Sequence, residues 1–258
     1  MAELPDLTVF AGILTKRFAG KKLKEVEVKE DGKLNVSAKE LKAALEGKQL
    51  KSVTREGKTL QLHFDDQVLG VHLMLRGELI LIDEDNPQPR FGILYFHFAT
   101  SGFAVVDLQK IATPTLNPPV SSVPDALAAE MDLTYFSNLL AKKRTTIKTL
   151  LMDQHMIRGI GNSYADEILW HAKISPFSIA KAIPEKEVNQ LYKSLRSVLQ
   201  KAIHDIEKEN GDELRGELRD FMKVHGAKIE KSPTGAKIKA EKIGGRMSYY
   251  TEEQELYT

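Results

Sequence analysis

The sequence contains no cysteine among its 258 residues. Disulfide bonds, thiolate metal sites and a thiol nucleophile are therefore excluded. No apolar run approaches the ~20 residues that a membrane-spanning helix needs. The first residues also lack the basic stretch, apolar core and cleavage site of a signal peptide. We therefore expect a cytoplasmic protein that makes no contact with a membrane.

An excess of charge of one sign is missing as well, because 37 Lys and Arg balance 36 Asp and Glu. The net charge of +1 hides the distribution, however, since residues 221–246 carry seven basic and two acidic side chains. Such a local excess can follow a phosphate backbone. A solvated lysine-rich surface explains it equally well. With 42% hydrophobic and 28% charged residues, the chain has the composition of an ordinary globular protein with one large or two smaller cores.

The first half of the chain predicts a β-rich domain covered by helices. A helix is expected after Pro5, which suits a first helical turn. Ser37 and Glu40 predict a capping box for a short helix. The pair Asp31-Gly32 predicts a hairpin between strands at residues 23–29 and 34–36. Further strands are expected at residues 50–54, 59–64, 68–75, 78–82, 90–98 and 103–107.

The second half predicts a mostly helical domain. Four prolines within residues 113–131 prevent a helix or an interior strand, so we interpret this segment as a linker. Helices are expected at residues 133–141 and 185–206, the latter with one apolar face, followed by a charged helical stretch at 211–222. A glycine-punctuated hairpin is expected within residues 224–250.

The most informative stretch is residues 142–176. Its apolar residues repeat at helical spacing, Gly159-Ile160-Gly161 interrupts them, and the period then resumes. The pattern predicts a helix, a tight turn and a second helix. Asn162 stands where the second helix begins, as an N-cap, and the backbone N–H groups at such an end form a seat for a phosphate.

This stretch closely resembles the helix–two-turns–helix motif of the formamidopyrimidine-DNA glycosylase and endonuclease VIII (Fpg/Nei) family. The family signature DQ-x-IxGIGNxYADEIL matches Asp153, Gln154 and residues 157–169. The resemblance covers nearly the whole chain and implies an α+β fold. Its expected parts are an N-terminal β-sandwich domain with flanking helices (1–112), a linker (113–131), a helix–two-turns–helix domain (132–223) and a metal-free β-hairpin finger (224–258).

The resemblance also implies a catalytic group at the N-terminus. Family members begin, once the initiator methionine is lost, with Pro-Glu-Leu-Pro-Glu, and residues 2–6 here read Ala-Glu-Leu-Pro-Asp. In the family the N-terminal amine attacks C1′ of a flipped-out damaged nucleotide, and the resulting Schiff base expels the base and allows β,δ-elimination. The implied roles are Ala2 as nucleophile, Glu3 as proton shuttle and Lys58 as a lysine on the phosphate beside the lesion. An α-amine titrates near ~7.7 to 8.0, so a neutral, nucleophilic fraction exists at physiological pH.

Five further positions correspond to DNA-binding residues of the family. Leu75 follows His72-Leu73-Met74 and can act as an apolar wedge in the base stack. The arginine and phenylalanine that usually complete this wedge fall on Gln109 and Ile111, which leaves opposite-base discrimination open. Asn162 and Arg246 match residues that grip the phosphates flanking the flipped nucleotide.

The finger departs from the family pattern at its metal site. The four cysteines that usually bind zinc fall on Lys231, Thr234, Thr251 and Gln254. Lysine and threonine do not form a structural zinc site. The resemblance is therefore to the zincless finger of some members, and we expect no metal and no cofactor. Such a small hairpin has little core of its own, so docking onto the helical domain should matter for its stability.

Together the matches imply a monomeric base-excision repair DNA glycosylase with AP lyase activity. Its partner would be double-stranded DNA with damaged or abasic sites, in the bacterial cytoplasm or nucleoid. Two alternatives remain open: a catalytically silent binder of damaged DNA, and a glycosylase that activates water through Glu3. Residues 207–223 look too short for the family's base-capping loop. Oxidised pyrimidines, ring-opened purines and bulkier adducts are therefore equally open, without support for 8-oxoguanine.

Overall fold

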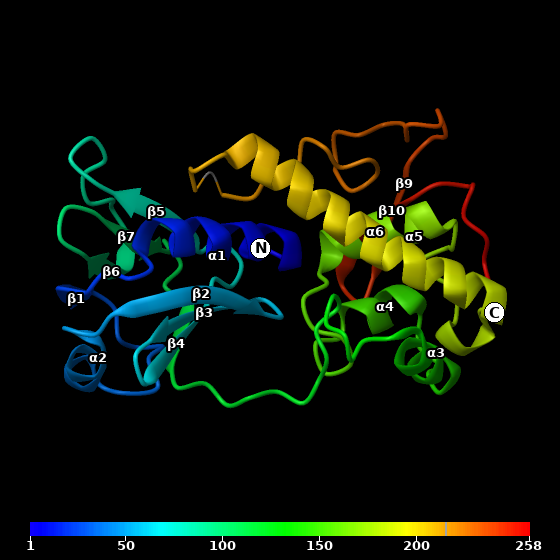
Figure 1. Cartoon of the computed structure of the whole chain (residues 1–258). Helices are drawn as coiled ribbons and strands as arrows, with labels where there is room; N and C mark the ends of the chain where they lie inside the picture. The colour runs from blue at the N-terminus through cyan, green and yellow to red at the C-terminus, as the bar shows by residue number, and fades with distance from the viewer. Residues whose placement is uncertain (215) are drawn as a thin grey trace. The chain divides into compact units, whose positions relative to one another are not determined.

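The computed structural model describes residues 1–214 and 216–258 (Figure 1). Contacts group the chain into two units, residues 1–120 with 206–218 and residues 121–205 with 219–258. The domain limits at residues 112, 131 and 223 remain a prediction, and the first unit includes residues that this prediction assigns to the helical domain. None of the helices in the described ranges is long and apolar enough to cross a membrane.

The first unit is built on two four-stranded antiparallel sheets with the strand orders β1-β6-β7-β5 and β2-β3-β4-β8. The strands of the first sheet are β1 (Glu25–Val28), β6 (Gly92–His97), β7 (Gly102–Val106) and β5 (Glu78–Ile82). Those of the second are β2 (Leu50–Glu56), β3 (Thr59–Phe64), β4 (Gln67–His72) and β8 (Thr113–Leu116). The predicted strands at 50–54, 59–64 and 78–82 are thereby confirmed.

One apolar core joins both sheets to helix α1 (Leu4–Phe18). Phe18 stacks on Phe98 with 4.7 Å between ring centroids, and Phe103 lies 5.3 Å from Phe18. Pro5 stands in the first turn of α1, where a missing N–H costs no hydrogen bond. The predicted α+β fold with an N-terminal β-sandwich is confirmed.

The predicted hairpin at Asp31-Gly32 is wrong. Strand β1 pairs with β6, with Val28 opposite Leu94, and residues 34–36, which lie inside the described range, form no strand. Leu34 packs against the core instead, and its N–H closes a turn on the carbonyl of Asp31. The next helix, α2 (Ala38–Leu45), begins with the predicted capping box of Ser37 and Glu40.

Strand β8 occupies the start of the segment predicted as a linker. It pairs with β4 at the edge of the second sheet, where Pro114 lies opposite Val71. An edge strand tolerates proline because one side of its backbone makes no ladder hydrogen bonds. The four prolines therefore exclude an interior strand, as predicted, but not an edge strand.

The second unit is helical, as predicted. Its helices are α3 (Leu133–Ala141), α4 (Ile147–Met152), α5 (Asn162–Ala172), the 3₁₀ helix η1 (Ala180–Ala182) and α6 (Glu185–Asn210). The interruption between α4 and α5 confirms the helix, turn and helix read from the sequence. Gly161, not Asn162, is the N-cap of α5, and Asn162 is its first residue. Gly161 is the cap because its backbone is extended, at φ −122° and ψ −160°.

The charged helix predicted at residues 211–222 is wrong. In the described parts of this segment, 211–214 and 216–222, the chain forms turns and irregular structure. Gly211 takes a left-handed φ of +57° and ends α6. Asp212 then binds two side chains of α1: Lys16 Nζ reaches its Oδ1 at 2.7 Å, and Arg17 Nε donates to its carbonyl at 3.0 Å. These contacts replace a further helical turn.

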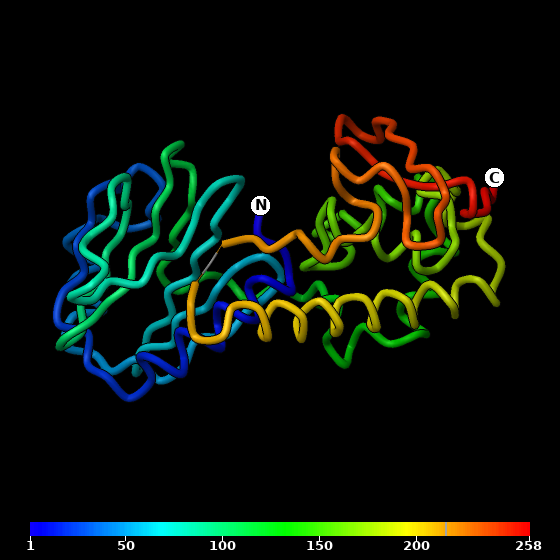
Figure 2. The backbone as a smooth tube through the Cα atoms, turned by 90° about the horizontal axis from the view of Figure 1, so that it is seen from above, coloured from blue at the N-terminus to red at the C-terminus, as the bar shows by residue number. Residues whose placement is uncertain are grey.

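The finger is a two-stranded hairpin of β9 (Lys239–Ile243) and β10 (Arg246–Tyr250). Gly244 and Gly245 form its turn with φ of +56° and +79°, which a two-residue mirror-image turn requires. Figure 2 shows the hairpin in orange and red beside the green helices of the same unit. The predicted finger hairpin is thus confirmed.

A buried carboxylate on α5 holds this hairpin. Asp166 Oδ1 lies 2.7 Å from Lys148 Nζ and accepts a hydrogen bond from Ser248 Oγ at 2.9 Å. Its Oδ2 accepts the N–H of Tyr249 at 3.0 Å and lies 2.7 Å from His225 Nδ1. Asp166 therefore connects α4, the finger and the segment that enters the finger.

The next residue of α5, Glu167, binds the segment that enters the finger through backbone N–H groups. Glu167 accepts hydrogen bonds from the N–H groups of residues 223–225 at 2.8 to 3.0 Å. Several N–H donors on one carboxylate fix the loop that supplies them. Consecutive residues of α5 thus attach both the β10 strand and the chain leading to it.

Replacing Asp166 by Ala should lower the free energy of unfolding by about 3–5 kcal/mol, because it leaves the Lys148 charge buried without its partner. Both side chains of this pair are fully buried. Chemical denaturation followed by circular dichroism measures the loss. The control is Asp205→Ala, which breaks the partly exposed Lys201–Asp205 pair on α6 and should cost about 0.5 kcal/mol. Equal losses in the two variants would contradict the anchoring role.

Candidate functional site

A reciprocal capping box holds the N-terminus at the start of α1. Asp6 Oδ2 accepts the N–H of Glu3 at 2.9 Å, and the Glu3 carboxylate accepts the N–H of Asp6. Ala2 and Glu3 are buried, with 4% and 3% of their surface exposed. The cap explains the burial of Glu3 on structural grounds alone. It also fixes a carboxylate next to the beginning of the chain.

A cavity of about 640 Å³ lies beside these residues in the first unit. Its walls are formed by the N-terminus, Phe10, residues 75–80 and residues 214, 216 and 217. The α-amino nitrogen of Met1 lies 2.5 Å from Glu217 Oε1. The sequence predicts that residues 207–223 are too short for the family's base-capping loop. Leu214, Gly216 and Glu217 nevertheless line this cavity. Sequence reasoning missed Glu217, which no motif marks.

Lys58 occupies the turn between β2 and β3. It follows Gly57, whose φ of +58° lies in the left-handed region, and only 9% of its surface is exposed. Arg55 connects this turn to α1, since its Nε donates to Thr8 Oγ1 at 2.9 Å and its Nη1 to the carbonyl of Gly57 at 3.0 Å. The turn is therefore held in place by the first helix.

His72 lies near Lys58 and was missed by sequence reasoning. It stands opposite Thr59 in the β3–β4 register, one residue from Lys58. Burial lowers the pKa of His72, and the charge of Lys58 lowers it further. Its Nδ1 accepts the N–H of Met74 at 3.0 Å, so the neutral ring carries its proton on Nε2. The turn thus holds a cation beside a neutral donor.

The three predicted wedge positions differ in exposure. Leu75 is 54% exposed and forms part of the cavity wall. Gln109 is exposed, while Ile111 is only half-exposed. Both lie on a loop whose shape is fixed by buried Asp107, which accepts the N–H groups of Gln109, Ile111 and Ala112 at 2.8 to 2.9 Å. The structure therefore presents one of the three as an exposed apolar side chain.

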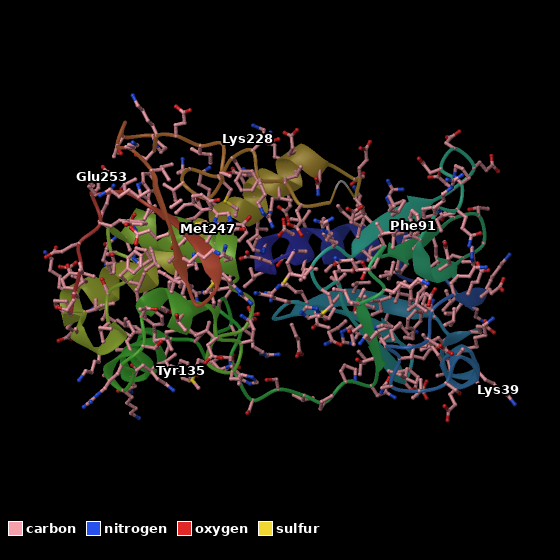
Figure 3. All side chains as sticks on the ribbon, turned by 180° about the vertical axis from the view of Figure 1, so that it is seen from behind. Lys39, Phe91, Tyr135, Lys228, Met247 and Glu253 are labelled. Atoms are coloured by element: carbon pink, nitrogen blue, oxygen red, sulfur yellow. The ribbon has the colours of Figure 1, made fainter. Side chains whose placement is uncertain are left out.

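The structure brings Asn162 and the finger tip together in the second unit. Asn162 Nδ2 donates to the carbonyl of Met247 at 3.0 Å, and Lys148 Nζ lies 3.3 Å from the same oxygen. The neighbouring Arg246 is exposed, with its Nη1 4.0 Å from Met152 Sδ. Figure 3 labels Met247 on this hairpin. Two positions far apart in sequence thus form one surface.

Two of the four positions that match the family's cysteines, Thr234 and Thr251, lie in a polar network around Glu253. Its Oε2 accepts hydrogen bonds from Thr234 Oγ1 at 2.8 Å and Thr251 Oγ1 at 3.1 Å. Lys173 Nζ lies 3.2 Å from Oε1, and Trp170 Nε1 donates to Oε2 at 3.3 Å. These bonds, with that of Thr234 largest, lower the pKa of Glu253 to about 2. A carboxylate therefore organises this end of the finger.

Comparison with known proteins assigns the chain to a family. Residues 1–113 match the formamidopyrimidine-DNA glycosylase N-terminal domain, and residues 123–211 match the formamidopyrimidine-DNA glycosylase H2TH domain. A formamidopyrimidine-DNA glycosylase of Lactococcus lactis subsp. cremoris is 30% identical, with 97% of each chain covered. The chain belongs to the formamidopyrimidine-DNA glycosylase family. The relative from Streptococcus mutans is 29% identical, again over 97% of each chain.

Solved structures of this family share the fold. A Lactococcus lactis Fpg in complex with DNA that contains an abasic site superposes with a TM-score of 0.87 at 28% identity, covering 98% of this chain and 100% of that one. A complex of the wild-type Lactococcus lactis enzyme with DNA that contains N7-benzyl-Fapy-dG has a TM-score of 0.86 at 29% identity, covering 98% and 99%.

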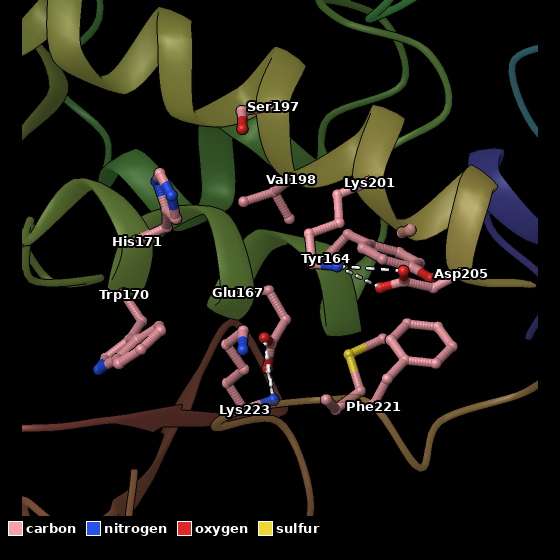
Figure 4. A pocket seen from close by; sticks show the side chains of 12 residues that line it. Tyr164, Glu167, Trp170, His171, Ser197, Val198, Lys201, Asp205, Phe221 and Lys223 are labelled. Carbon is pink, nitrogen blue, oxygen red and sulfur yellow. Dashed lines mark hydrogen bonds and ion pairs between the residues drawn. The ribbon is translucent and has the colours of Figure 1, made fainter. Parts of the chain in front are cut away.

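A second cavity, of about 370 Å³, lies in the second unit of this family member between α5 and α6 (Figure 4). Several of its polar groups already have partners. Glu167 accepts the N–H of Lys223, and Lys201 pairs with Asp205, as the dashed lines show. His171 Nδ1 lies 2.9 Å from Ser194 Oγ.

Replacing Glu253 by Gln should flatten the pH dependence of thermal stability on the acidic side. The folded-state pKa of about 2 lies below the ordinary 4.5. The network therefore contributes stability above about pH 4.5, and this contribution is lost as the pH falls towards about 2. Melting curves at several pH values measure the effect. Glu252→Gln, which removes one exposed pair with Lys239, should change the curve less, and an equal change would contradict the network.

Proposed function

We propose that this protein is a base-excision DNA glycosylase with AP lyase activity on double-stranded DNA that contains damaged or abasic sites. The observation that carries the proposal is the position of Ala2 and Glu3, which the capping box of α1 fixes beside a cavity. Family membership supports the reaction class, and the complexes of the Lactococcus lactis relatives with abasic and Fapy-containing DNA support the substrate. Such an enzyme belongs with the DNA, in the bacterial cytoplasm or nucleoid.

In this proposal the nucleophile is the α-amine of Ala2 after removal of Met1. Its lone pair attacks C1′ of the flipped-out nucleotide, and the base leaves with the electrons of the glycosidic bond. The C1′–O4′ bond of the sugar then opens, O4′ takes a proton, and the Schiff base forms between C1′ and the amine. Glu3 donates and accepts the protons of these steps, because its carboxylate is fixed next to the amine. β- and δ-elimination then break the sugar–phosphate bonds.

Removal of Met1 decides whether this chemistry can occur. While Met1 is present, the amine belongs to the wrong residue and pairs with Glu217. A displacement by one residue is severe for positioned catalysis. Once Met1 is gone, the Ala2 amine opens into the same cavity. An intact-mass measurement therefore precedes every activity assay.

The phosphate contacts are proposed for three residues. Lys58 supplies a cation from the β2–β3 turn of the first unit, with His72 as a neutral donor nearby. Asn162 and Arg246 supply contacts from the second unit, at the start of α5 and the tip of the finger. We further propose that the finger keeps its shape without metal, through the carboxylates of Asp166 and Glu253.

Borohydride trapping on a duplex with an abasic site tests the lyase. We expect a covalent adduct that mass spectrometry locates on Ala2. Ala2→Pro, which restores the residue usual in the family, should form the same adduct. Binding of the duplex by processed protein, without adduct or strand cleavage, would favour the catalytically silent binder. Base release without an adduct would favour water activated through Glu3.

Replacing Glu3 by Gln should lower the rate of base release by about 100-fold or more, because the proton shuttle is lost while the amide still accepts the cap hydrogen bond. Single-turnover kinetics with an oxidised-base duplex measure this rate. Asp6→Asn is the matched control, since it weakens the same capping box from its other side. That variant should lose about 1 kcal/mol of stability and keep most of its activity. Equal loss of activity in both would assign Glu3 to the cap alone.

Replacing Arg246 by Ala should weaken binding to all DNA sequences alike and reduce the salt slope, log K against log salt, by about 1. Each phosphate contact releases counterions, so its loss lowers that slope. Fluorescence anisotropy at several salt concentrations measures both quantities. Lys39→Ala, an exposed lysine on α2 labelled in Figure 3, serves as the control and should leave the slope unchanged. An unchanged slope in the Arg246 variant would remove this residue from the phosphate contacts.

A further inference from the structure

The cavity between α5 and α6 has the size of a small-molecule site (Figure 4). Its volume of about 370 Å³ lies within the ~300–1,000 Å³ of typical ligand pockets. All of its lining residues belong to the second unit, whereas the cavity beside the N-terminus is lined by residues of the first. No residue lines both cavities, so a ligand held here would not occupy the proposed reaction site.

The walls of this cavity are mostly apolar and carry several aromatic rings. Its apolar and aromatic lining residues are Tyr164, Trp170, Val198, Ala202, Phe221 and Met222. Aromatic side chains bind flat ring systems by stacking, and every nucleobase offers such a face. The walls therefore favour a flat aromatic ligand over an aliphatic one.

The carboxylates that line this cavity have their donors within the protein. Glu167 accepts the N–H groups of residues 223–225, and Asp205 pairs with Lys201 at 3.0 Å. Both negative charges are thus compensated, so neither calls for a cationic ligand.

Positive charge at this cavity lacks such compensation. No carboxylate in the described parts of the chain pairs with the ammonium of exposed Lys223. Partial burial lowers the pKa of His171, and the charges of Lys223 and Lys173 lower it further. Lys173 pairs with Glu253 at 3.2 Å, which leaves Lys223 as the uncompensated charge near this ring. An anionic group beside Lys223 would replace this repulsion by attraction.

We propose that this cavity binds a small aromatic anion of the nucleoside monophosphate class. The base lies against the aromatic walls, and the phosphate binds Lys223 Nζ. His171 Nδ1 lies 2.9 Å from Ser194 Oγ, so its Nε2 is the ring nitrogen available to the same phosphate. The ligand would join α5 and α6 to residues 221–223, which lead into the finger, and it should therefore stabilise the second unit. None of these steps depends on lyase chemistry.

The fluorescence of Trp170 reports on this cavity directly, because it is the single tryptophan of the chain and lines the wall. Titration of the full-length protein with adenosine 5′-monophosphate, without DNA, should quench this fluorescence to saturation and raise the melting temperature. Inorganic phosphate has no ring and should leave the fluorescence unchanged. Adenosine lacks the anion and should bind about 10-fold more weakly than the monophosphate.

Replacing Lys223 by Ala tests the phosphate contact. Alanine keeps the backbone N–H that Glu167 accepts, so the segment stays attached. The variant should bind adenosine 5′-monophosphate about 10-fold more weakly and adenosine with unchanged affinity. Lys242→Ala, which removes an exposed lysine of β9, is the matched control and should bind both as wild type does.

Two results would overturn the site. One is the absence of saturable quenching by adenosine 5′-monophosphate in the wild-type protein. The other is equal affinity of the wild-type protein and the Lys223 variant for this nucleotide. A borohydride adduct on Ala2 changes neither reading, so the ligand site and the lyase stand or fail separately.

Discussion

Two adjacent carboxylates on α5 hold the second unit together. Between them, Asp166 and Glu167 accept hydrogen bonds from the finger and from the segment that enters it. Burying such charges is costly unless each has several donors. Here the cost is offset by Lys148, by His225 and by backbone N–H groups. The surface formed by Asn162 and the finger tip depends on this anchor.

In the first unit, contacts at both ends of α1 hold the first residues in a defined position. Chain ends are usually mobile unless a helix or strand fixes them. Here the capping box of Glu3 and Asp6 starts α1 almost at the first residue, and the aromatic contacts of Phe18 fix the other end of that helix in the core. A terminal amine with a defined position is what covalent catalysis through the N-terminus requires.

Hydrogen-bonded carboxylates hold the finger at two places, around Asp166 and around Glu253. The family pattern uses four cysteines in the finger instead. Around Glu253, neutral hydroxyls, an indole N–H and one ammonium surround a single carboxylate. A thiolate–zinc site draws together side chains from both ends of a finger, and a carboxylate with several donors can do the same at lower strength. The proposal that this finger folds without metal rests on these hydrogen bonds.

The sequence by itself determined the family, the α+β class, the position of the helix–turn–helix segment and, to within a few residues, the place of most helices and strands. Those features are local, since caps, turn glycines and apolar periodicity act over a few residues. Only the tertiary structure decided that β1 pairs with β6, that His72 stands beside Lys58 and that Glu217 meets the N-terminus. These neighbours are set by strand pairing and by contacts between distant segments, which no local pattern records.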